Sequence, residues 1–369
     1  MRLGLVRYKY DQGGGAERTL GLLARGLLER GHQVHLVTSA WQGAAPPGLR
    51  IRLVPPAGPA RWARAAAQSA AGLGLDTWLS LERVPGSPLF RAGDGVHAAW
   101  LARRAPYEPL MKRLSFGLNP KHRSLLELER RTLGAPQLRG VIAVSRLVAG
   151  ELQEYYGVPA DKIKVIYNGV DEQMLASARE AWLRQDARRE LSLEPGRPAL
   201  LFLGSGWERK GLAFALAALV RLKDALLLVA GRDRPQAWQA RAARLGVAER
   251  VRWLGLRTDV AALLAGCDAL VLPSIYDPCP NSALEALYAG LPVVTTQAAG
   301  ACELLEPGKS GVVVSRADAV EELAAACQAA LGLPRGFVHR VPGQQQWLGQ
   351  VVAVLEAAAA AQAKPVASQ

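Results

Sequence analysis

Residues 276–296 read YDPCPNSALEALYAGLPVVTT, and no other stretch of the chain says as much about its fold. Asn281 opens a helical pattern, and the apolar run LPVVTT follows it as a strand. Asp277 precedes this helix, and Glu285 lies inside it eight positions later. The free N–H groups at a helix start attract a diphosphate, and nearby carboxylates accept hydrogen bonds from sugar hydroxyls. The stretch predicts a site for a sugar nucleotide, although an ordinary capped helix has the same pattern.

Strand and helix patterns alternate on both sides of this stretch. The predicted strands cover residues 3–8, 32–39, 138–145, 163–167, 199–205, 225–231, 251–255, 269–274, 291–296 and 311–315. The predicted helices cover residues 19–31, 146–157, 211–222, 236–246, 259–267, 281–290, 317–332 and 344–363. This alternation is typical of doubly wound α/β domains, which bind ligands at the carboxyl ends of their strands.

The length of 369 residues suits two domains. We predict an N-terminal Rossmann-like domain over residues 1–170 and a second one over residues 171–340. Residues 171–198 are polar and Arg-rich, and we interpret them as a linker and the entrance to the second domain. Residues 341–369 form a terminal helix, which can pack back on the N-terminal domain, and a frayed tail.

Composition favours a folded protein of the cytosol. Half of the residues are apolar, which allows a large core and argues against global disorder. No apolar run approaches the ~20 residues of a membrane span, and the start, MRLGLVRY, lacks a signal-peptide cleavage pattern. The four cysteines lack metal-ligand spacing and suit a reduced compartment.

The net charge of +13 is divided unequally along the chain. Residues 1–170 hold 24 Lys/Arg against 12 Asp/Glu, whereas residues 171–369 hold 21 against 20. A basic N-terminal half predicts an anionic partner: a phosphorylated glycan, an acidic lipid surface or nucleic acid. No nucleic-acid recognition motif is present, so we expect no nucleic-acid partner. An arginine-rich genome would also raise this count.

Residues 98–125 combine positive charge with apolar side chains. Six Lys/Arg stand against the single acid Glu108, and aromatic and aliphatic residues are interleaved with them. Apolar anchors with cations are typical of a segment that lies on an anionic membrane surface. The alternative is a helical excursion that docks on its own domain, with its arginines in water.

Four motifs occur in a characteristic order: GGGAER from residue 13, IYNGVD from residue 166, GSGWERKG from residue 204, and the element from Asp277 to Glu285. Together they resemble the retaining glycosyltransferases of family 4, over nearly the whole chain. The resemblance implies the GT-B fold, in which two Rossmann-like doubly wound α/β domains face each other across a deep cleft. The segments VRYKYDQGGGAER and TSAWQG are most similar to the lipopolysaccharide core glucosyltransferase I group.

The resemblance implies roles for two charged pairs. Arg209 and Lys210 match the cations that neutralise the donor diphosphate, so they also stabilise the charge that develops on the leaving group. Glu285 matches the glutamate that binds the ribose. Asp277 matches the acid on the sugar side and counts as catalytic, but the family usually has Glu there. This shorter side chain leaves the identity of the donor sugar open.

Further donor-binding residues follow from the same resemblance. They are Gly13, Gly14, Gly15, Ser205, Gly255, Arg257, Asn281, Ser282 and Ala283. The glycines allow the backbone to approach the donor closely. The residues at the helix start offer N–H groups to the phosphate. We expect backbone groups near Gly255 and Arg257 to contact the base.

Two polar residues in RAGDGVHAAW match the acceptor side or the sugar side of the family's site. We favour Asp94 as the catalytic carboxylate on the acceptor side and His97 as a contact to a sugar hydroxyl in the donor site. The opposite assignment, or a structural role for each residue, stays open at this point.

The resemblance implies a metal-independent, retaining hexosyltransferase of class EC 2.4 that needs no cofactor. We expect a UDP-sugar, with glucose as the first choice, and a phosphorylated glycolipid acceptor such as the heptose of the lipopolysaccharide core. Another donor sugar (galactose or an N-acetylhexosamine), another acceptor, or a nucleotide-sugar epimerase remains an alternative. We expect a cytoplasmic protein, peripheral on the inner face of the bacterial cytoplasmic membrane, that serves the biosynthesis of the cell envelope.

Overall fold

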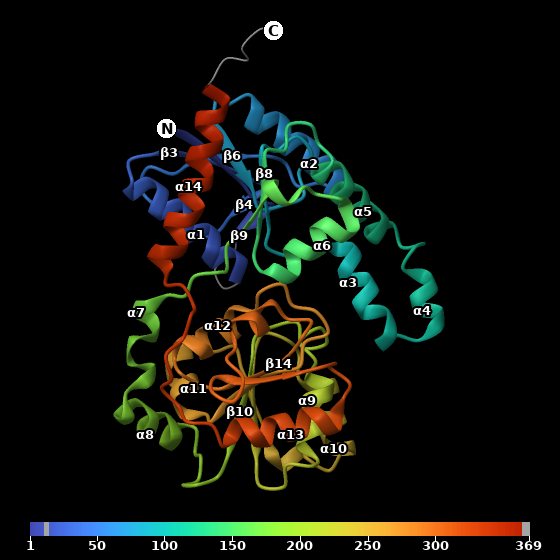
Figure 1. Ribbon diagram of the computed structural model, residues 1–369, viewed down its shortest axis with the longest axis vertical. Helices are drawn as coiled ribbons and strands as arrows, with labels where there is room; N and C mark the ends of the chain where they lie inside the picture. Colours follow the sequence, from blue (N-terminus) through green and yellow to red (C-terminus); the bar gives the residue numbers. More distant parts are fainter. Residues whose placement is uncertain (11–14, 364–369) are drawn as a thin grey trace. The chain divides into compact units, whose positions relative to one another are not determined.

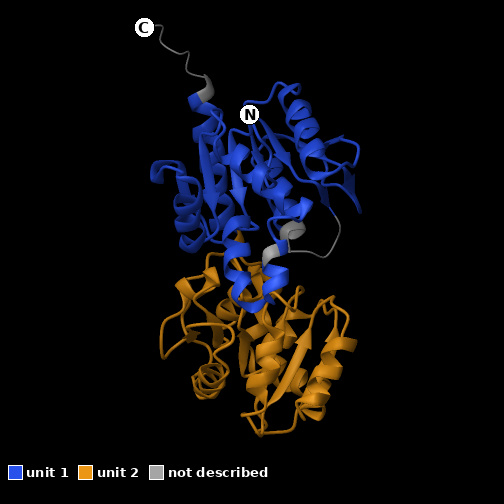
Figure 2. Cartoon of the chain, turned by 90° about the vertical axis from the view of Figure 1, so that its right-hand side faces the viewer, with its two compact units in different colours: residues 1–167, 345–369 blue, residues 168–344 orange. Residues whose placement is uncertain are grey.

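The computed structural model describes residues 1–10 and 15–363 (Figure 1). The chain divides into two compact units, coloured separately in Figure 2. Unit 1 comprises residues 1–167 and 345–369, and unit 2 comprises residues 168–344. The sequence predicts the corresponding boundaries at residues 170 and 340. Each unit is built around a parallel β-sheet, as the alternating pattern predicts.

Unit 1 holds a sheet of seven parallel strands in the order β5-β3-β1-β6-β7-β8-β9. The strands are β1 (Arg2–Val6), β3 (Gln33–Thr38), β5 (Arg50–Leu53), β6 (Thr77–Ser80), β7 (Leu89–Ala92), β8 (Gly140–Ala143) and β9 (Ile163–Val165). A separate pair of short strands consists of β2 (Lys9–Tyr10) and β4 (Ala40–Trp41). The strand order reverses beside β1, because β3 lies on one side of it and β6 on the other.

Helices and short 3₁₀ turns connect the strands of unit 1. They are α1 (Gly15–Glu29), α2 (Pro59–Ala71), α3 (His97–Arg104), η1 (Ala105–Tyr107), α4 (Leu110–Ser115), α5 (Pro120–Leu133), α6 (Arg146–Tyr156) and η2 (Ala160–Lys162). The capping residues explain the bounds of α6: Ser145 accepts a hydrogen bond from the N–H of Val148, and Gly157 closes the helix in a left-handed conformation.

The final helix, α14 (Gln344–Ala363), belongs almost wholly to unit 1. Its apolar residues, among them Trp347, Leu348 and Leu355, are buried in the same core as α1 and β1. Figure 1 shows α14 beside α1. A Cβ at Gly26 of α1 would stand 2.0 Å from a methyl carbon of Leu348, so glycine permits this close approach. The sequence therefore predicted both this helix and its position correctly.

Unit 2 holds six parallel strands in the order β12-β11-β10-β13-β14-β15. The strands are β10 (Ala199–Leu203), β11 (Leu226–Ala230), β12 (Val251–Gly255), β13 (Ala269–Leu272), β14 (Val293–Thr296) and β15 (Gly311–Val314). The helices are α7 (Glu172–Leu175), α8 (Ala181–Glu190), α9 (Leu212–Leu219), α10 (Gln236–Arg244), α11 (Val260–Gly266), α12 (Asn281–Tyr288) and α13 (Val320–Leu331). Three 3₁₀ turns are η3 (Ala176–Arg179), η4 (Ala248–Arg250) and η5 (Gly300–Leu304). The strand order reverses beside β10, between β11 and β13.

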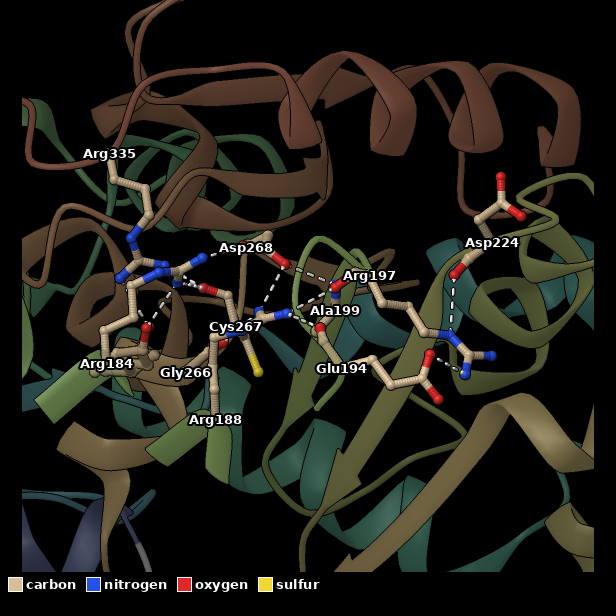
Figure 3. Close-up of polar contacts among 12 residues, drawn as sticks. Arg184, Arg188, Glu194, Arg197, Ala199, Asp224, Gly266, Cys267, Asp268 and Arg335 are labelled. Atoms are coloured by element: carbon tan, nitrogen blue, oxygen red, sulfur yellow. Dashed lines mark hydrogen bonds and ion pairs between the residues drawn. The ribbon is translucent and has the colours of Figure 1, made fainter. Parts of the chain in front are cut away.

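The linker that the sequence predicts over residues 171–198 is wrong, because α7, η3 and α8 occupy most of this segment. Arg184 and Arg188 of α8 both reach Asp268, at 2.6 and 3.4 Å, and also donate to carbonyl groups at the end of α11 (Figure 3). Arg335 donates to the carbonyl of Leu264 at 3.0 Å and to that of Cys267. Cations stabilise the last carbonyls of a helix, so Arg184 and Arg188 fasten α8 to the end of α11, and Arg335 joins the segment after α13 to the same helix end.

None of the helices in the described part of the chain has the combination of length and apolarity that a membrane span requires.

Candidate functional site

In unit 2, a compact charge cluster forms where the strand order reverses. Arg209 and Lys210 follow β10, and Asp277 follows β13. The ammonium group of Lys210 lies 2.7 Å from Oδ2 of Asp277, and Nη1 of Arg209 lies 3.1 Å from the same oxygen. The sequence predicted all three residues for one site, and the structure brings them together. In doubly wound sheets this point of the carboxyl edge binds ligands.

The cluster is largely removed from water. Lys210 is 7% exposed and Asp277 is 5% exposed, whereas about a third of the Arg209 side chain is exposed. Burial alone raises the pKa of Asp277, but the charges of Arg209 and Lys210 outweigh burial and hold that pKa below its usual value. Asp277 is therefore an ionised carboxylate. It supports the two cations: the partly exposed Arg209 can contact a ligand anion directly, and the buried Lys210 contributes its positive charge to the same site.

Backbone contacts hold the two loops of the cluster together. The N–H of Ile275 donates to the carbonyl of Arg209 at 2.9 Å, and Nη1 of Arg209 donates to the carbonyl of Tyr276 at 2.7 Å. Gly211 has φ = 81°, and a Cβ there would stand 2.0 Å from the carbonyl oxygen of Pro273. Only glycine tolerates both conditions, which explains the last glycine of GSGWERKG.

Helix α12 begins beside this cluster, as the sequence predicts. The N–H of Ala283 already donates to the carbonyl of Pro280 at 3.0 Å, within the first turn. In the described part of the chain, no hydrogen bond from the N–H groups of Asn281 or Ser282 is found. Among the three predicted phosphate contacts, Asn281 and Ser282 therefore offer N–H groups, whereas Ala283 does not. Glu285 is buried on the same helix.

Asn168, in the IYNGVD motif, is a contact that the sequence did not reveal. Its side-chain amide donates to Oδ1 of Asn281 at 2.7 Å and to the carbonyl of Cys279 at 3.3 Å. Asn168 therefore fixes the start of α12. Its asparagine–glycine pair indicates a turn, but the sequence gives no sign of a partner 113 residues away.

Asp233, after β11, is a second residue that the sequence did not reveal. Its carboxylate accepts hydrogen bonds from the N–H groups of Gly206 at 2.8 Å and Trp207 at 3.1 Å. The hydroxyl of Ser205 accepts from the N–H of Arg232 at 3.1 Å. These bonds join the loop after β10, which holds Arg209 and Lys210, to the loop after β11. The predicted donor contact Ser205 is exposed at this edge.

The predicted base contacts lie at the end of β12. Gly255 is exposed, and its carbonyl accepts from the N–H of Gly231 at 2.8 Å. The guanidinium of Arg257 pairs with both Asp259 and Glu190. The hydrogen bonds that Arg257 donates to Asp259, together with the charges of both acids, raise the pKa of Arg257 despite partial burial. The guanidinium of Arg257 is thus held by two carboxylates of unit 2.

In unit 1, Asp94 and His97 lie in the turn that leads from β7 into α3. Asp94 is exposed, and His97 is half-buried. Behind the turn lies Glu129 of α5, which is 1% exposed. Its carboxylate accepts from the N–H of His97 at 2.9 Å and from the N–H of Ala98 at 3.3 Å. Glu129 therefore caps α3 and neutralises the positive end of its dipole.

Two further groups donate to Glu129. Nε of Arg83 lies 2.8 Å away, and the hydroxyl of Tyr156 lies 2.7 Å away. Arg83 also donates to the carbonyl of Gly95 at 3.0 Å, next to Asp94. Burial and the adjacent Glu129 carboxylate raise the pKa of Tyr156 well above its usual value, so this hydroxyl remains protonated. The network fixes the turn that presents Asp94.

His97 also contacts a second histidine. Its Nε2 lies 3.1 Å from Nδ1 of His122 on α5. Burial, followed by the charge of Arg83, lowers the pKa of His97 to about 4. Burial also lowers the pKa of His122. Both rings are neutral near pH 7, so one donates to the other and the ring orientation of His97 is set.

The basic segment, residues 98–125, folds as most of α3, η1, α4 and the start of α5. Leu110, Met111 and Leu118 are exposed, with Met111 at 78%. Arg104 and Lys112 pair with Glu108, and Arg103 pairs with Glu151 at 3.0 Å. The remaining three cations have no carboxylate within ion-pair distance in the described chain: Arg113, Lys121 and Arg123.

The predicted glycine-rich loop is only partly described. Gly13 and Gly14 lie outside the described residues, and Gly15 is the first residue of α1. The structure brings together Arg209, Lys210, Asp277 and the start of α12 in unit 2. Asp94 and His97 lie close together in the other.

Comparisons with known proteins agree with the predicted family. Residues 13–75 and 93–174 match the family "Glycosyltransferase Family 4", and residues 197–332 match "Glycosyl transferases group 1". The lipopolysaccharide glucosyltransferase WaaG of Escherichia coli K12 is 26% identical over 327 residues, which cover 86% of each chain.

Solved structures show the same fold. The crystal structure of WaaG has a TM-score of 0.77 at 24% identity and covers 89% of this chain and 90% of its own. The structure of Anabaena Alr3699/HepE in complex with UDP and glucose has a TM-score of 0.67 at 19% identity, covering 96% of this chain and 99% of its own. The two family matches of the present chain and the shared fold show that it belongs to the family 4 glycosyltransferases of the GT-B fold.

Proposed function

We propose that the protein transfers a hexose, with glucose as the first choice, from a UDP-sugar to a phosphorylated glycolipid. The observation that carries this proposal is the cation pair Arg209–Lys210, held beside the start of α12 at the reversal point of the sheet. This arrangement suits a diphosphate leaving group. The similarity to a lipopolysaccharide glucosyltransferase supports glucose as the donor sugar and a lipopolysaccharide acceptor, within which we propose the heptose of the core. The relative solved with UDP and glucose shares the fold and supports UDP.

The proposed reaction retains the anomeric configuration by front-face substitution. The bond between C1 of the sugar and the diphosphate oxygen breaks, and Arg209 and Lys210 stabilise the charge that develops on the leaving group. The acceptor hydroxyl then bonds to C1 on the same face. Its proton passes to the departing phosphate or to Asp94. Two fixed cations take the place of a metal ion, so we expect neither a metal nor a cofactor.

A donor screen tests the proposal. Ligands that bind only the folded state raise its stability by about 2.7 kcal/mol at a concentration of 100 Kd. We expect UDP-glucose to raise the Tm with concentration, and UDP-galactose, UDP-N-acetylglucosamine and ADP-glucose to do so less. Absence of any shift with every nucleotide sugar would contradict the proposal. A stronger shift with another UDP-sugar would replace glucose as the donor.

Product analysis separates transfer from epimerisation. We expect release of UDP to depend on the acceptor and to persist in a chelator, and NMR of the product to show the donor's own anomeric configuration. An epimerised sugar nucleotide formed without acceptor would identify the epimerase alternative instead. Inhibition by the chelator that a divalent cation reverses would contradict the metal-independent mechanism.

We also propose that the basic segment, residues 98–125, holds the protein on the inner face of the cytoplasmic membrane. The exposed side chains of Leu110, Met111 and Leu118 supply apolar anchors, and nearby cations attract anionic lipids. We expect co-sedimentation with phosphatidylglycerol vesicles that weakens with salt and with the double substitution of Leu110 and Met111 by Ser. Equal binding to neutral phosphatidylcholine vesicles would contradict an electrostatic component.

A further inference from the structure

Each unit places a cation and a carboxylate at the equivalent point of its sheet. In unit 2, Lys210 and Asp277 follow β10 and β13, where the strand order reverses. In unit 1 the reversal lies between β1 and β6. Arg7 comes directly after β1, and Glu82 comes two residues after β6. Since ligands of doubly wound sheets bind at such points, the second pair occupies the position where unit 1 would take a ligand.

The pair in unit 1 is looser than the pair in unit 2. Nη1 of Arg7 lies 3.3 Å from Oε1 of Glu82, and the N–H of Tyr8 donates to the same oxygen at 3.2 Å. Charge-assisted hydrogen bonds are typically about 2.8 Å long, as the Lys210–Asp277 contact nearly is. In the described part of the chain, both contacts of this carboxylate use Oε1. The Glu82 side chain is 23% exposed, so a ligand can reach part of it.

The backbone beneath Glu82 is fixed. The hydroxyl of Ser80 donates to the carbonyl of Glu82 at 2.6 Å, and the N–H of Glu82 donates back to that hydroxyl at 3.2 Å. The loop therefore holds Glu82 in place without using its carboxylate. A side chain that is held by its backbone while its charged group is loosely paired suits ligand binding better than structural support.

Other charged groups surround Glu82. Burial raises its pKa, and the charge of Asp94 raises it further, whereas Arg7 and Arg83 lower it. The candidate acceptor-side carboxylate Asp94 follows β7, the strand beside β6, so it lies at the same edge of the sheet as Glu82. A ligand bound to Glu82 and Arg7 would place a neighbouring group close to Asp94.

We propose that Arg7 and Glu82 bind two adjacent hydroxyls of the acceptor sugar and so determine acceptor specificity; this inference rests on the proposed function. A sugar hydroxyl can donate a hydrogen bond to the carboxylate of Glu82, and a sugar hydroxyl can also accept one from the guanidinium of Arg7. Glu82 binds and orients the sugar, and the proton of the reacting hydroxyl goes elsewhere. Sites built to pair with a sugar hydroxyl reject analogues that lack it.

The test uses a water-soluble, deacylated lipopolysaccharide core oligosaccharide that ends in heptose, which removes any contribution from lipid binding. We expect Glu82→Gln to raise the Kd for this oligosaccharide, and its KM in transfer from UDP-glucose, about tenfold or more. The KM for UDP-glucose and the slow hydrolysis of UDP-glucose without acceptor should change less than about twofold. For Glu82→Asp, we expect the Kd and the KM for the oligosaccharide to lie between those of Glu82→Gln and those of the wild type.

Glu127→Gln is the matched control, because Glu127 is an exposed residue of α5 in unit 1 and pairs with the surface residues Arg130 and Arg131. An unchanged Kd for the oligosaccharide in Glu82→Gln would overturn the inference. Equal loss of acceptor binding and of UDP-glucose stabilisation would also overturn it, since that result indicates a structural role. Failure of the wild type to bind any UDP-sugar would instead refute the proposed function, because oligosaccharide binding is measured without donor.

Discussion

The two units treat charge in opposite ways. Residues 1–170 carry an excess of 12 positive charges, yet at the candidate site of unit 1 the carboxylates of Glu82, Asp94 and Glu129 outnumber the two arginines that pair with them, Arg7 and Arg83. Residues 171–369 are nearly neutral, yet their candidate site presents Arg209 and Lys210. Net charge thus reports the surface of a domain, whereas the charge at a site depends on a few buried partners.

The largest expected effect tests the cation pair of unit 2. We expect Lys210→Ala and Arg209→Ala each to lower the rate of hexose transfer by about 10²-fold or more, since each removes a fixed charge from the leaving group. Steady-state assays of UDP release measure this. The exposed Arg241→Ala on α10 should change the rate less than about twofold. Near-normal rates in both site variants would refute the assignment.

Stability distinguishes the two cations. Lys210 is buried against Asp277, so its removal should lower the free energy of unfolding by about 3 kcal/mol. Arg209 is partly exposed, so its removal should cost about 1 kcal/mol or less. Urea unfolding measures both values. Equal losses of unfolding free energy in the two variants would show that Lys210 and Arg209 stabilise the buried carboxylate of Asp277 equally.

A smaller effect tests the carboxylate network of unit 1. We expect Glu129→Gln to lower the free energy of unfolding by about 2–3 kcal/mol, because Arg83 loses its buried partner, and Tyr156→Phe by about 1–2 kcal/mol. Urea unfolding of the full chain measures both, with Glu127→Gln as the surface control. A midpoint for Glu129→Gln equal to that of the control would show that Glu129 does not hold the turn.

Another small effect concerns acid stability. The pKa of His97 is lowered to about 4 in the folded protein, below the ~6.5 of an unfolded chain. Between pH 6.5 and about 4 the unfolded state binds more protons, so stability falls as the pH falls through this window. We expect the free energy of unfolding of His97→Asn to fall by about 1–2 kcal/mol less than that of the wild type over this pH window. This value allows for the partial exposure of the His97 ring. Parallel curves of Tm against pH for both proteins would contradict this.

The sequence predicted the sheets, α12 and α14 well, because hydrophobic periodicity and helix-capping residues are local signals. It also predicted Arg209, Lys210 and Asp277 together, since the chain order of the motifs places them after neighbouring strands. It did not reveal Glu129, Asp233 or Asn168. Each acts through backbone or amide groups far away in the chain, and no local pattern marks such a partner.

The Arg-rich segment before β10 shows the same limit. Its polarity indicated a linker, yet Arg184 and Arg188 are bound to the end of α11 and to Asp268. An arginine that is solvated and one that satisfies buried carbonyls look alike in sequence. Whether such an arginine is solvated or buried depends on partners about 80 residues away in the sequence, as in the Arg188–Asp268 bond.

The return of α14 to unit 1 has a consequence for biosynthesis. Unit 2 is one continuous segment, so it can complete its fold as soon as residue 344 has left the ribosome. The N-terminal portion waits longer, because Trp347, Leu348 and Leu355 belong to its core. The part of the protein that is made first is therefore finished last, and until then it exposes apolar side chains that α14 later covers.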